Sequence, residues 1–253
     1  MIAAALVAAL PFAHLGQVPG EIVCEGQYPR HLQGIAGNGV DTLYWSFTDT
    51  LVKTDANGRI LAKVEVPYHH GDLCLVEDRV YVAWARKFNQ PAGDDAHVYV
   101  YEAGDLSLIE VIPLPEVPFG AGGIAYHDGR FLVVGGLPKD FEENYVFEYT
   151  DDFDYVATHV IPSGYTTLGI QTACWHDGFW WFGCYTVEGK KGLLKTDPDL
   201  NLVGIFDVSP AIGLVGWGEG RLLMTKHFGE EFQAKAIPMV ADDERGLVAW
   251  PGE

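Results

Sequence analysis

A repeating unit of about 40–50 residues limits the folds open to this sequence more than any other feature. Each unit begins with an apolar strand that contains Gly, a tight turn and an aromatic-rich strand, as in residues 123–134 and 172–182. A second hairpin follows, with Asp, Asn or Gly in its turn, as in residues 51–67 and 192–209. The first hairpin recurs through the whole chain, and the second through most of it. The sequence therefore predicts four antiparallel strands per unit.

This period and strand number are typical of the blade of a β-propeller. We predict an all-β fold, a five-bladed β-propeller with four antiparallel strands per blade. The expected blades cover residues 31–67, 69–113, 119–162, 167–209 and 211–253. A β-sandwich would not show five like units in phase, and no residues are left for a sixth blade. A single domain over residues 20–253 agrees with the size of large all-β domains.

The last unit lacks a clean second hairpin. Residues 228–253 have an irregular pattern, although residues 246–250 could form a strand. The segment from Glu21 to Cys24 precedes the first blade and has no partner of its own. We expect this N-terminal strand to complete the fifth blade and close the ring, which would protect sheet edges from pairing with other chains.

Residues 1–19 are predicted to be a signal peptide, because an apolar run extends from Met1 to Ala13. The run is too short to span a bilayer and lacks the usual basic start. The alternative is an apolar strand or helix that belongs to the domain. With a signal peptide, the protein would be secreted or periplasmic.

The formal net charge of −19 limits the expected partners. A strongly acidic surface repels phosphate backbones and anionic lipids, so we expect neither nucleic acid nor a membrane surface as partner. The same charge favours solubility, and we expect a monomer.

The four cysteines, Cys24, Cys74, Cys174 and Cys184, do not have zinc-site spacing. Export would permit disulfides, and four cysteines allow three pairings. Cys74 and Cys174 occupy equivalent places in different repeats, where small buried residues are expected. We therefore expect free thiols that pack as small apolar side chains.

The mouth of the central channel is the expected place for a ligand. In a propeller the first strand of each blade lines the channel, and the loops that enter these strands form one mouth. Most residues at the five entries are small or apolar, as a narrow channel requires. When the five entries are aligned, His31 and His69 occupy equivalent positions, and so do Gln33 and Gln171. The polar exceptions are His31, Gln33, His69, His70, Asp72 and Gln171.

These side chains favour binding of a small polar ligand, either a sugar or the end of a peptide, at the channel mouth. The predicted ligand-binding residues are His31, Gln33, His69, His70, Asp72, Thr167 and Gln171. In the structural alternative, the same polar groups hold water and satisfy buried backbone atoms. A further alternative is a protein-interaction scaffold that uses the outer faces.

An enzyme with its site at the same mouth is the second hypothesis. Asp72 would be the general acid/base, and His31 and His70 would assist it, because imidazole titrates near neutral pH. The pair His70 and Asp72 could also hold a divalent metal. The sequence itself requires no cofactor.

The first two units resemble a known family through residues 31–35 (His-Leu-Gln-Gly-Ile), residues 48–55 and the Gly71-Asp72 entry. The family is that of the glutaminyl cyclases (glutamine cyclotransferases), five-bladed propellers of plants and bacteria. The resemblance implies that Asp72 stands where the family has a glutamate in its pocket, and Gln33 where it has an entry glutamine. The implied activity is conversion of an N-terminal Gln to pyroglutamate.

Three departures from the family pattern affect what is carried over. The Glu-Ser-Thr-Gly segment of the family is replaced here by residues 45–48 (Trp-Ser-Phe-Thr), and Asp72 is one methylene shorter than a glutamate. Trp217 lies in a Gly-Trp-Gly sequence like that of the family, but in the last unit rather than in mid-chain. The resemblance covers a minor part of the chain.

Overall fold

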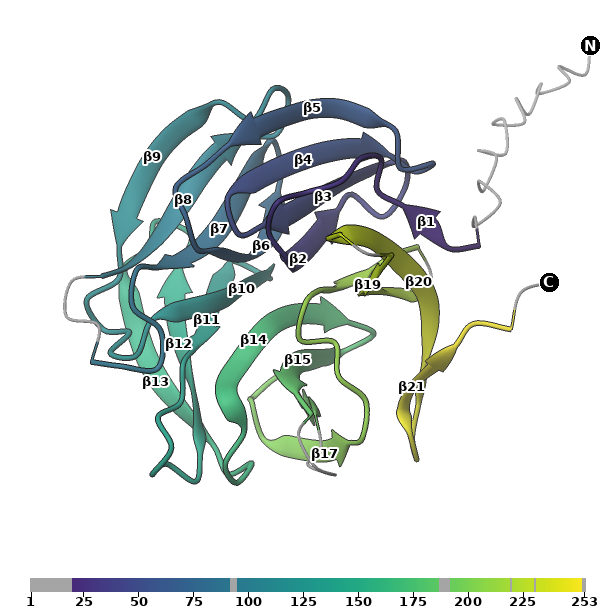
Figure 1. The fold of residues 1–253 in the computed structure, drawn as a ribbon. Coiled ribbons are helices and arrows are strands. Elements are labelled where there is room, and N and C mark those ends of the chain that lie inside the picture. Colours follow the sequence, from purple (N-terminus) through teal and green to yellow (C-terminus); the bar gives the residue numbers. More distant parts are fainter. Residues whose placement is uncertain (1–19, 92–94, 187–191, 219, 230, 252–253) are drawn as a thin grey trace, which may run out of the picture.

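The computed structural model of the protein is a ring of five β-sheets around a central axis (Figure 1). It describes residues 20–91, 95–186, 192–218, 220–229 and 231–251. No helix occurs in these residues, and each sheet is antiparallel, with four or five strands. The predicted five-bladed β-propeller is therefore confirmed. The proposed signal peptide, residues 1–19, lies outside the described residues.

The first four blades share one plan, in which consecutive strands run from the channel to the rim. Blade 1 contains β2 (Leu32–Gly37), β3 (Thr42–Phe47), β4 (Thr50–Asp55) and β5 (Ile60–Glu65). Blade 2 contains β6 (His70–Val76), β7 (Arg79–Ala85), β8 (Ala96–Glu102) and β9 (Leu108–Pro113). Blade 3 contains β10 (Ala121–His127), β11 (Arg130–Gly135), β12 (Asn144–Thr150) and β13 (Tyr155–Ile161). Blade 4 contains β14 (Thr167–His176), β15 (Phe179–Tyr185), β16 (Leu193–Thr196) and β17 (Leu202–Phe206).

Blade 5 differs at its outer edge. Its strands are β18 (Leu214–Gly216), β19 (Leu222–Phe228), β20 (Gln233–Asp242), β21 (Gly246–Ala249) and β1 (Ile22–Val23). Both β1 and β21 pair with β20, β1 opposite residues 235–236 and β21 opposite residues 239–242. In Figure 1 the purple β1 accordingly lies beside the yellow β20.

The segment that follows β19 is more regular than the sequence indicated. Strand β20 runs for ten residues through the part that we expected to be irregular. Small Ala side chains alternate with polar ones at its start, and Pro238 lies in its middle. Both features make this sequence less typical of a strand, because strands are usually rich in β-branched and aromatic residues.

The hydrophobic core consists of five clusters, one for each contact between neighbouring blades. Strand β7 shows how a middle strand serves two of them. Val80 and Val82 pack toward blade 1, whereas Tyr81 and Ala83 pack toward blade 3. Successive side chains of a strand point to opposite faces, so a strand buried on both faces has a continuous apolar run.

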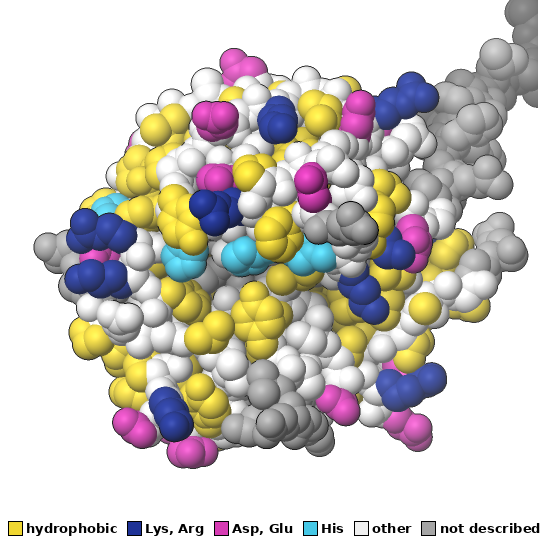
Figure 2. Space-filling view, viewed as in Figure 1, with side chains coloured by type: hydrophobic (Ala, Val, Ile, Leu, Met, Phe, Trp, Pro, Cys, Tyr) yellow, Lys and Arg dark blue, Asp and Glu magenta, His cyan; other side chains and the backbone are white. Residues whose placement is uncertain are grey.

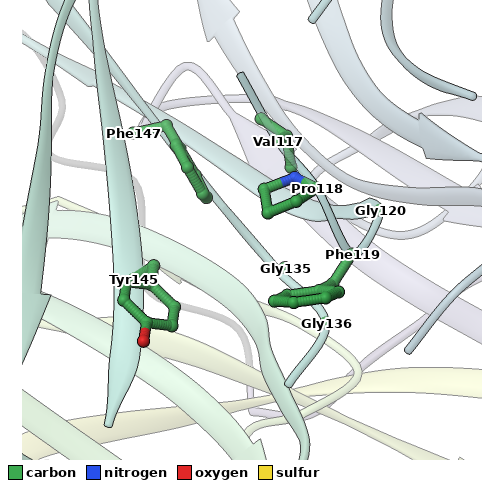
Figure 3. A pocket seen from close by; sticks show the side chains of 8 residues that line it. All are labelled: Val117, Pro118, Phe119, Gly120, Gly135, Gly136, Tyr145 and Phe147. Atoms are coloured by element: carbon green, nitrogen blue, oxygen red, sulfur yellow. The ribbon is translucent and has the colours of Figure 1, made fainter. Parts of the chain in front are cut away.

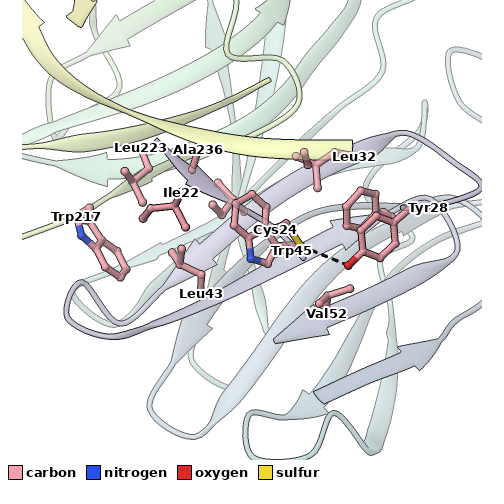
Figure 4. Close-up of a cluster of buried hydrophobic side chains, with 13 residues drawn as sticks. Ile22, Cys24, Tyr28, Leu32, Leu43, Trp45, Val52, Trp217, Leu223 and Ala236 are labelled. Carbon is pink, nitrogen blue, oxygen red and sulfur yellow. Dashed lines mark hydrogen bonds between the residues drawn. The ribbon is translucent and has the colours of Figure 1, made fainter. Parts of the chain in front are cut away.

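The contact between blade 5 and blade 1 joins the two ends of the ring (Figure 4). Ile22 and Cys24 from the N-terminal segment pack there with Trp45 of blade 1 and Trp217 of blade 5. The Cys24 thiol is within 3.4 Å of the Tyr28 hydroxyl, and burial raises its pKa to about 12. This thiol is therefore protonated at neutral pH.

All four cysteines are free thiols, as expected. Cys24, Cys174 and Cys184 are buried, and Cys74 is half-buried. In the part of the chain that the structure describes, no helix has the length and apolar character needed to cross a membrane.

Candidate functional site

The first strands of the five blades line the channel, and the residues that enter them meet at one mouth. Figure 2 shows histidine side chains gathered in a row across the centre of one face of the molecule. His31 directly precedes β2 and His69 directly precedes β6, so the repeat brings both to this end of the channel. We call this end the entry mouth.

His31 is half-buried beside the turn that joins β3 and β4. The Thr48 hydroxyl donates a hydrogen bond to the His31 carbonyl (3.1 Å) and lies 3.4 Å from its Nδ1. Burial lowers the pKa of His31, and the nearby charges of His227 and His69 lower it further. A hydrogen bond with the Gln33 side chain acts in the opposite direction. His31 is therefore mostly neutral at pH 7.

His69 is held in an unusual backbone conformation, with φ of +80°. Its Nδ1 donates a hydrogen bond to the Ala85 carbonyl (2.6 Å), so the proton is on Nδ1 and Nε2 carries a lone pair. This Nε2 has no partner among the residues that the structure describes. The ring stacks on Tyr68, with 5.7 Å between ring centroids, and meets the edge of Phe88 at 6.0 Å.

His227, near the end of β19, is a third imidazole at the mouth, and the sequence analysis missed it. Its Nε2 accepts a hydrogen bond from the Leu32 N–H (3.2 Å), which ties blade 5 to blade 1. Its ring centroid is 6.5 Å from that of His31, and Phe232 packs against both rings. Burial lowers the pKa of His227. The second strand of every blade returns to the entry mouth, so an alignment of these strand ends could have found this residue.

The two glutamines of the aligned entries are nearly buried, but only one of them contacts a histidine. Gln33 hydrogen-bonds with His31. Gln171 instead donates to the Leu168 carbonyl of its own loop (2.6 Å). Thr167 begins β14 opposite Tyr185 and has no recorded contact with the histidines. The structure therefore brings together His31, Gln33 and His69, and places Gln171 and Thr167 in blade 4.

His70 lies apart from the mouth, although it is the next residue after His69. It is 0% exposed, and both ring nitrogens have partners. Its Nδ1 donates to the Pro67 carbonyl (2.7 Å), and its Nε2 accepts from the Tyr101 hydroxyl (2.7 Å). Burial lowers its pKa to about 4. With no free nitrogen, this side chain cannot contact a ligand in the channel, and we exclude it from the candidate site.

Asp72 is also 0% exposed and connects strands across the channel. Its Oδ2 accepts a hydrogen bond from the Ala173 N–H of blade 4 (3.0 Å). The N–H groups of Leu73 and Ile35 also favour its charged form, but burial dominates and raises the pKa. A side chain at Gly34 would collide with Asp72, so Gly34 allows blades 1 and 2 to approach closely here.

The structure does not favour a metal at His70 and Asp72. Both nitrogens of His70 are used in hydrogen bonds, so neither is free for coordination. Among the described residues, no group of three or more His, Cys, Asp or Glu side chains is arranged to hold a metal ion.

A cavity of about 170 Å³ occupies the other end of the channel, where the first strands end. Ala36, Cys74, Ala125, Ala173 and Gly216 are among its lining residues. Asp72 is not among the lining residues, but Ala173, to which it is hydrogen-bonded, and the adjacent Leu73 are. The entry mouth and the cavity thus lie at opposite ends of the innermost strands, with the buried Asp72 between them.

A second, much smaller cavity of about 10 Å³ lies between the loop that enters blade 3 and strands β11 and β12 (Figure 3). Its lining residues are Val117, Pro118, Phe119, Gly120, Gly135, Gly136, Tyr145 and Phe147. Its volume is that of about one water molecule, so it is no candidate for a larger ligand.

Comparison with known proteins identifies the fold. No protein-family model matches the sequence, and no curated protein matches it. Among solved structures, the Myxococcus xanthus glutaminyl cyclase is similar, with a TM-score of 0.61 and 14% identity over 89% of this chain and 97% of that chain. The RRP9 WD40 repeats give a TM-score of 0.52 at 9% identity, over 92% of this chain and 84% of that chain. At such identities the likeness concerns the fold, and the chain is a five-bladed β-propeller that resembles the glutaminyl cyclase propeller.

Proposed function

We propose that this protein is a binding propeller that takes a small polar ligand, a sugar or the end of a peptide, at the entry mouth. The convergence of three imidazoles, from blades 1, 2 and 5, is the observation that carries the proposal. Convergent polar groups at the end of a propeller channel are a common arrangement for ligand binding.

The hydrogen-bonding state of the imidazoles supports this proposal. His69 offers an unpartnered Nε2 lone pair, and Gln33 adds an amide beside His31. Phe88 and Phe232 supply apolar contacts next to these groups. Sugars and peptide ends combine hydroxyl, amide or charged groups with apolar faces, and would use both kinds of contact.

A binding screen against a glycan panel and a peptide panel tests the proposal. We expect a ligand whose affinity falls at least about tenfold in His31→Ala and in His69→Ala, the loss of one good hydrogen bond. His159→Ala is the matched control, because His159 pairs with Glu148 on outer strands of blade 3, away from the mouth. No binding in either panel would contradict the proposal and would favour a protein-interaction scaffold.

A glutaminyl-cyclase-like enzyme is the second candidate, and the likeness to the Myxococcus xanthus glutaminyl cyclase favours it. The burial of Asp72 weighs against it, because a general acid/base must reach its substrate directly or through one water. Incubation with a peptide that begins with Gln, followed by mass spectrometry for ammonia loss, tests this activity. Turnover that Asp72→Asn abolishes would establish the enzyme hypothesis.

We also propose that the protein is exported and monomeric. The apolar run within residues 1–19 supports export, and the net charge of −19 supports a soluble monomer. N-terminal sequencing of the protein secreted by its host, with light scattering of the purified protein, tests both points. An uncleaved N-terminus or a dimer mass would contradict the corresponding proposal.

A further inference from the structure

The side chains that act on the entry mouth are basic, whereas the protein as a whole is strongly acidic. The chain has 35 acidic and 16 basic residues. Yet the charged groups that act on His31 are His227, His69 and Arg30, all of which are positive when protonated. In Figure 2 the row of histidines crosses the centre of the face, with both basic and acidic side chains around it.

The other titratable groups near the mouth do not reverse this local excess of basic over acidic groups. Asp49 pairs with Arg30 (3.7 Å), which partly neutralises both. Tyr68 stacks on His69 and also receives the Arg30 guanidinium on its ring at 5.6 Å. Asp72 lies below the mouth and is fully enclosed. None of the charged groups that act on His31 is a carboxylate.

We propose that the ligand of the entry mouth carries a carboxylate, and that its binding is coupled to uptake of a proton by His31. The inference rests on the proposed binding function and names the chemical class of the ligand. A carboxylate would supply the negative charge that the imidazoles lack, and a charge-assisted hydrogen bond is stronger than a neutral one. The proton comes from solvent, and no covalent bond changes.

The contacts of the three imidazoles indicate which ones can accept this proton. His227 uses its Nε2 to accept the Leu32 N–H, so protonation would break a bond between blades 5 and 1. His69 keeps its Nδ1 bonded to the Ala85 carbonyl and presents its unpartnered Nε2 to a ligand. The Nδ1 of His31 faces the Thr48 hydroxyl, which can accept a hydrogen bond from a protonated Nδ1. His31 is therefore the site of proton uptake.

A carboxylate could come from the C-terminus of a peptide or from a uronic acid sugar. Two matched pairs of probes separate these sources and isolate the charge. One pair is N-acetyl-diglycine and its C-terminal amide, and the other is glucuronate and glucose. Isothermal titration calorimetry at pH 7, in two buffers with different ionisation enthalpies, measures affinity and proton uptake together.

We expect the carboxylate member of at least one pair to bind at least about tenfold more tightly than its neutral partner. Its heat of binding should depend on the buffer, and its affinity should rise as the pH falls toward 6, up to about tenfold per unit for one proton. His31→Gln should reduce the proton uptake, whereas the control His159→Gln should not.

The possible failures are distinguishable. If the neutral probes bind as tightly as the carboxylates, with no buffer dependence but with loss in His31→Ala, the binding function stands and this inference is wrong. If the carboxylates bind without proton uptake, the coupling is wrong. If no probe of any panel binds, both the inference and the proposed function are contradicted.

Discussion

Two layers of polar side chains lie at the entry end of the central channel, and they differ in burial. The upper layer consists of His31, His69 and His227, which are half-buried at the entry mouth. The lower layer consists of His70 and Asp72, which are 0% exposed. His69 and His70 are neighbours in sequence, yet one has an unpartnered nitrogen and the other has none.

This difference shows that side-chain direction, rather than residue type, separates a candidate ligand group from a structural one. The lower layer forms bonds within the protein, to Pro67, Tyr101 and Ala173, and of its side-chain polar atoms only Asp72 Oδ1 has no hydrogen-bond partner among the described residues. Buried polar groups need such partners to offset their lost hydration. We therefore expect the lower layer to determine stability and the upper layer to determine binding.

The largest expected effect is that of His70→Ala. The substitution leaves the Pro67 carbonyl and the Tyr101 hydroxyl without partners and opens a cavity. We expect a loss of about 3 kcal/mol in the free energy of unfolding, measured by urea denaturation. Tyr101→Phe, which removes one of the two bonds, should cost about 1 kcal/mol. A loss below 1 kcal/mol in His70→Ala would contradict a structural role.

The pH dependence of the free energy of unfolding should also reveal the burial of His70. The pKa of His70 is about 4 in the folded protein, against 6.5 as the reference for the unfolded chain. Because the unfolded state binds the proton more tightly, stability is complete above pH 6.5 and falls as the pH drops from 6.5 to 4. The expected loss from His70 is about 3 kcal/mol. His70→Gln should flatten this part of the profile, and an unchanged profile would contradict the assignment.

Substitutions of Asp72 test whether its side chain is a structural bridge or a catalytic group. Asp72→Ala leaves the Ala173 N–H unpaired, with an expected loss of about 2 kcal/mol. Asp72→Asn keeps an acceptor for this N–H, so we expect a loss below about 1 kcal/mol in chemical denaturation at pH 7. Because burial raises the pKa of Asp72, the wild type loses stability relative to Asp72→Asn as the pH rises. Equal losses in both variants would show that the bridge to Ala173 is unimportant.

The smallest expected effect on stability belongs to the upper layer. His31→Ala removes a half-buried ring that lies 3.4 Å from Thr48 through Nδ1, hydrogen-bonds with Gln33 and packs against Phe232. We expect less than about 1 kcal/mol of destabilisation in thermal or chemical unfolding, together with the loss of binding described above. A loss as large as that of His70→Ala would remove the distinction between the two layers.

The sequence predicted the entry mouth only in part. Aligned repeats identified His31, Gln33 and His69 as neighbours, because equivalent positions of a propeller lie around one axis. The same alignment included His70 and Asp72, whose burial depends on the side-chain directions set at the strand starts. It omitted His227, because a second strand rather than an entry loop brings that residue to the mouth.

The sequence by itself determined the number, order and approximate bounds of the blades. Strand alternation and turn residues are local signals, repeated along the chain, and each hairpin is specified by residues close in sequence. Only the tertiary structure decided which polar side chains face the mouth. That choice depends on contacts between blades far apart in sequence, such as the Asp72 bond to Ala173 and the Leu32 bond to His227, and no local pattern encodes them.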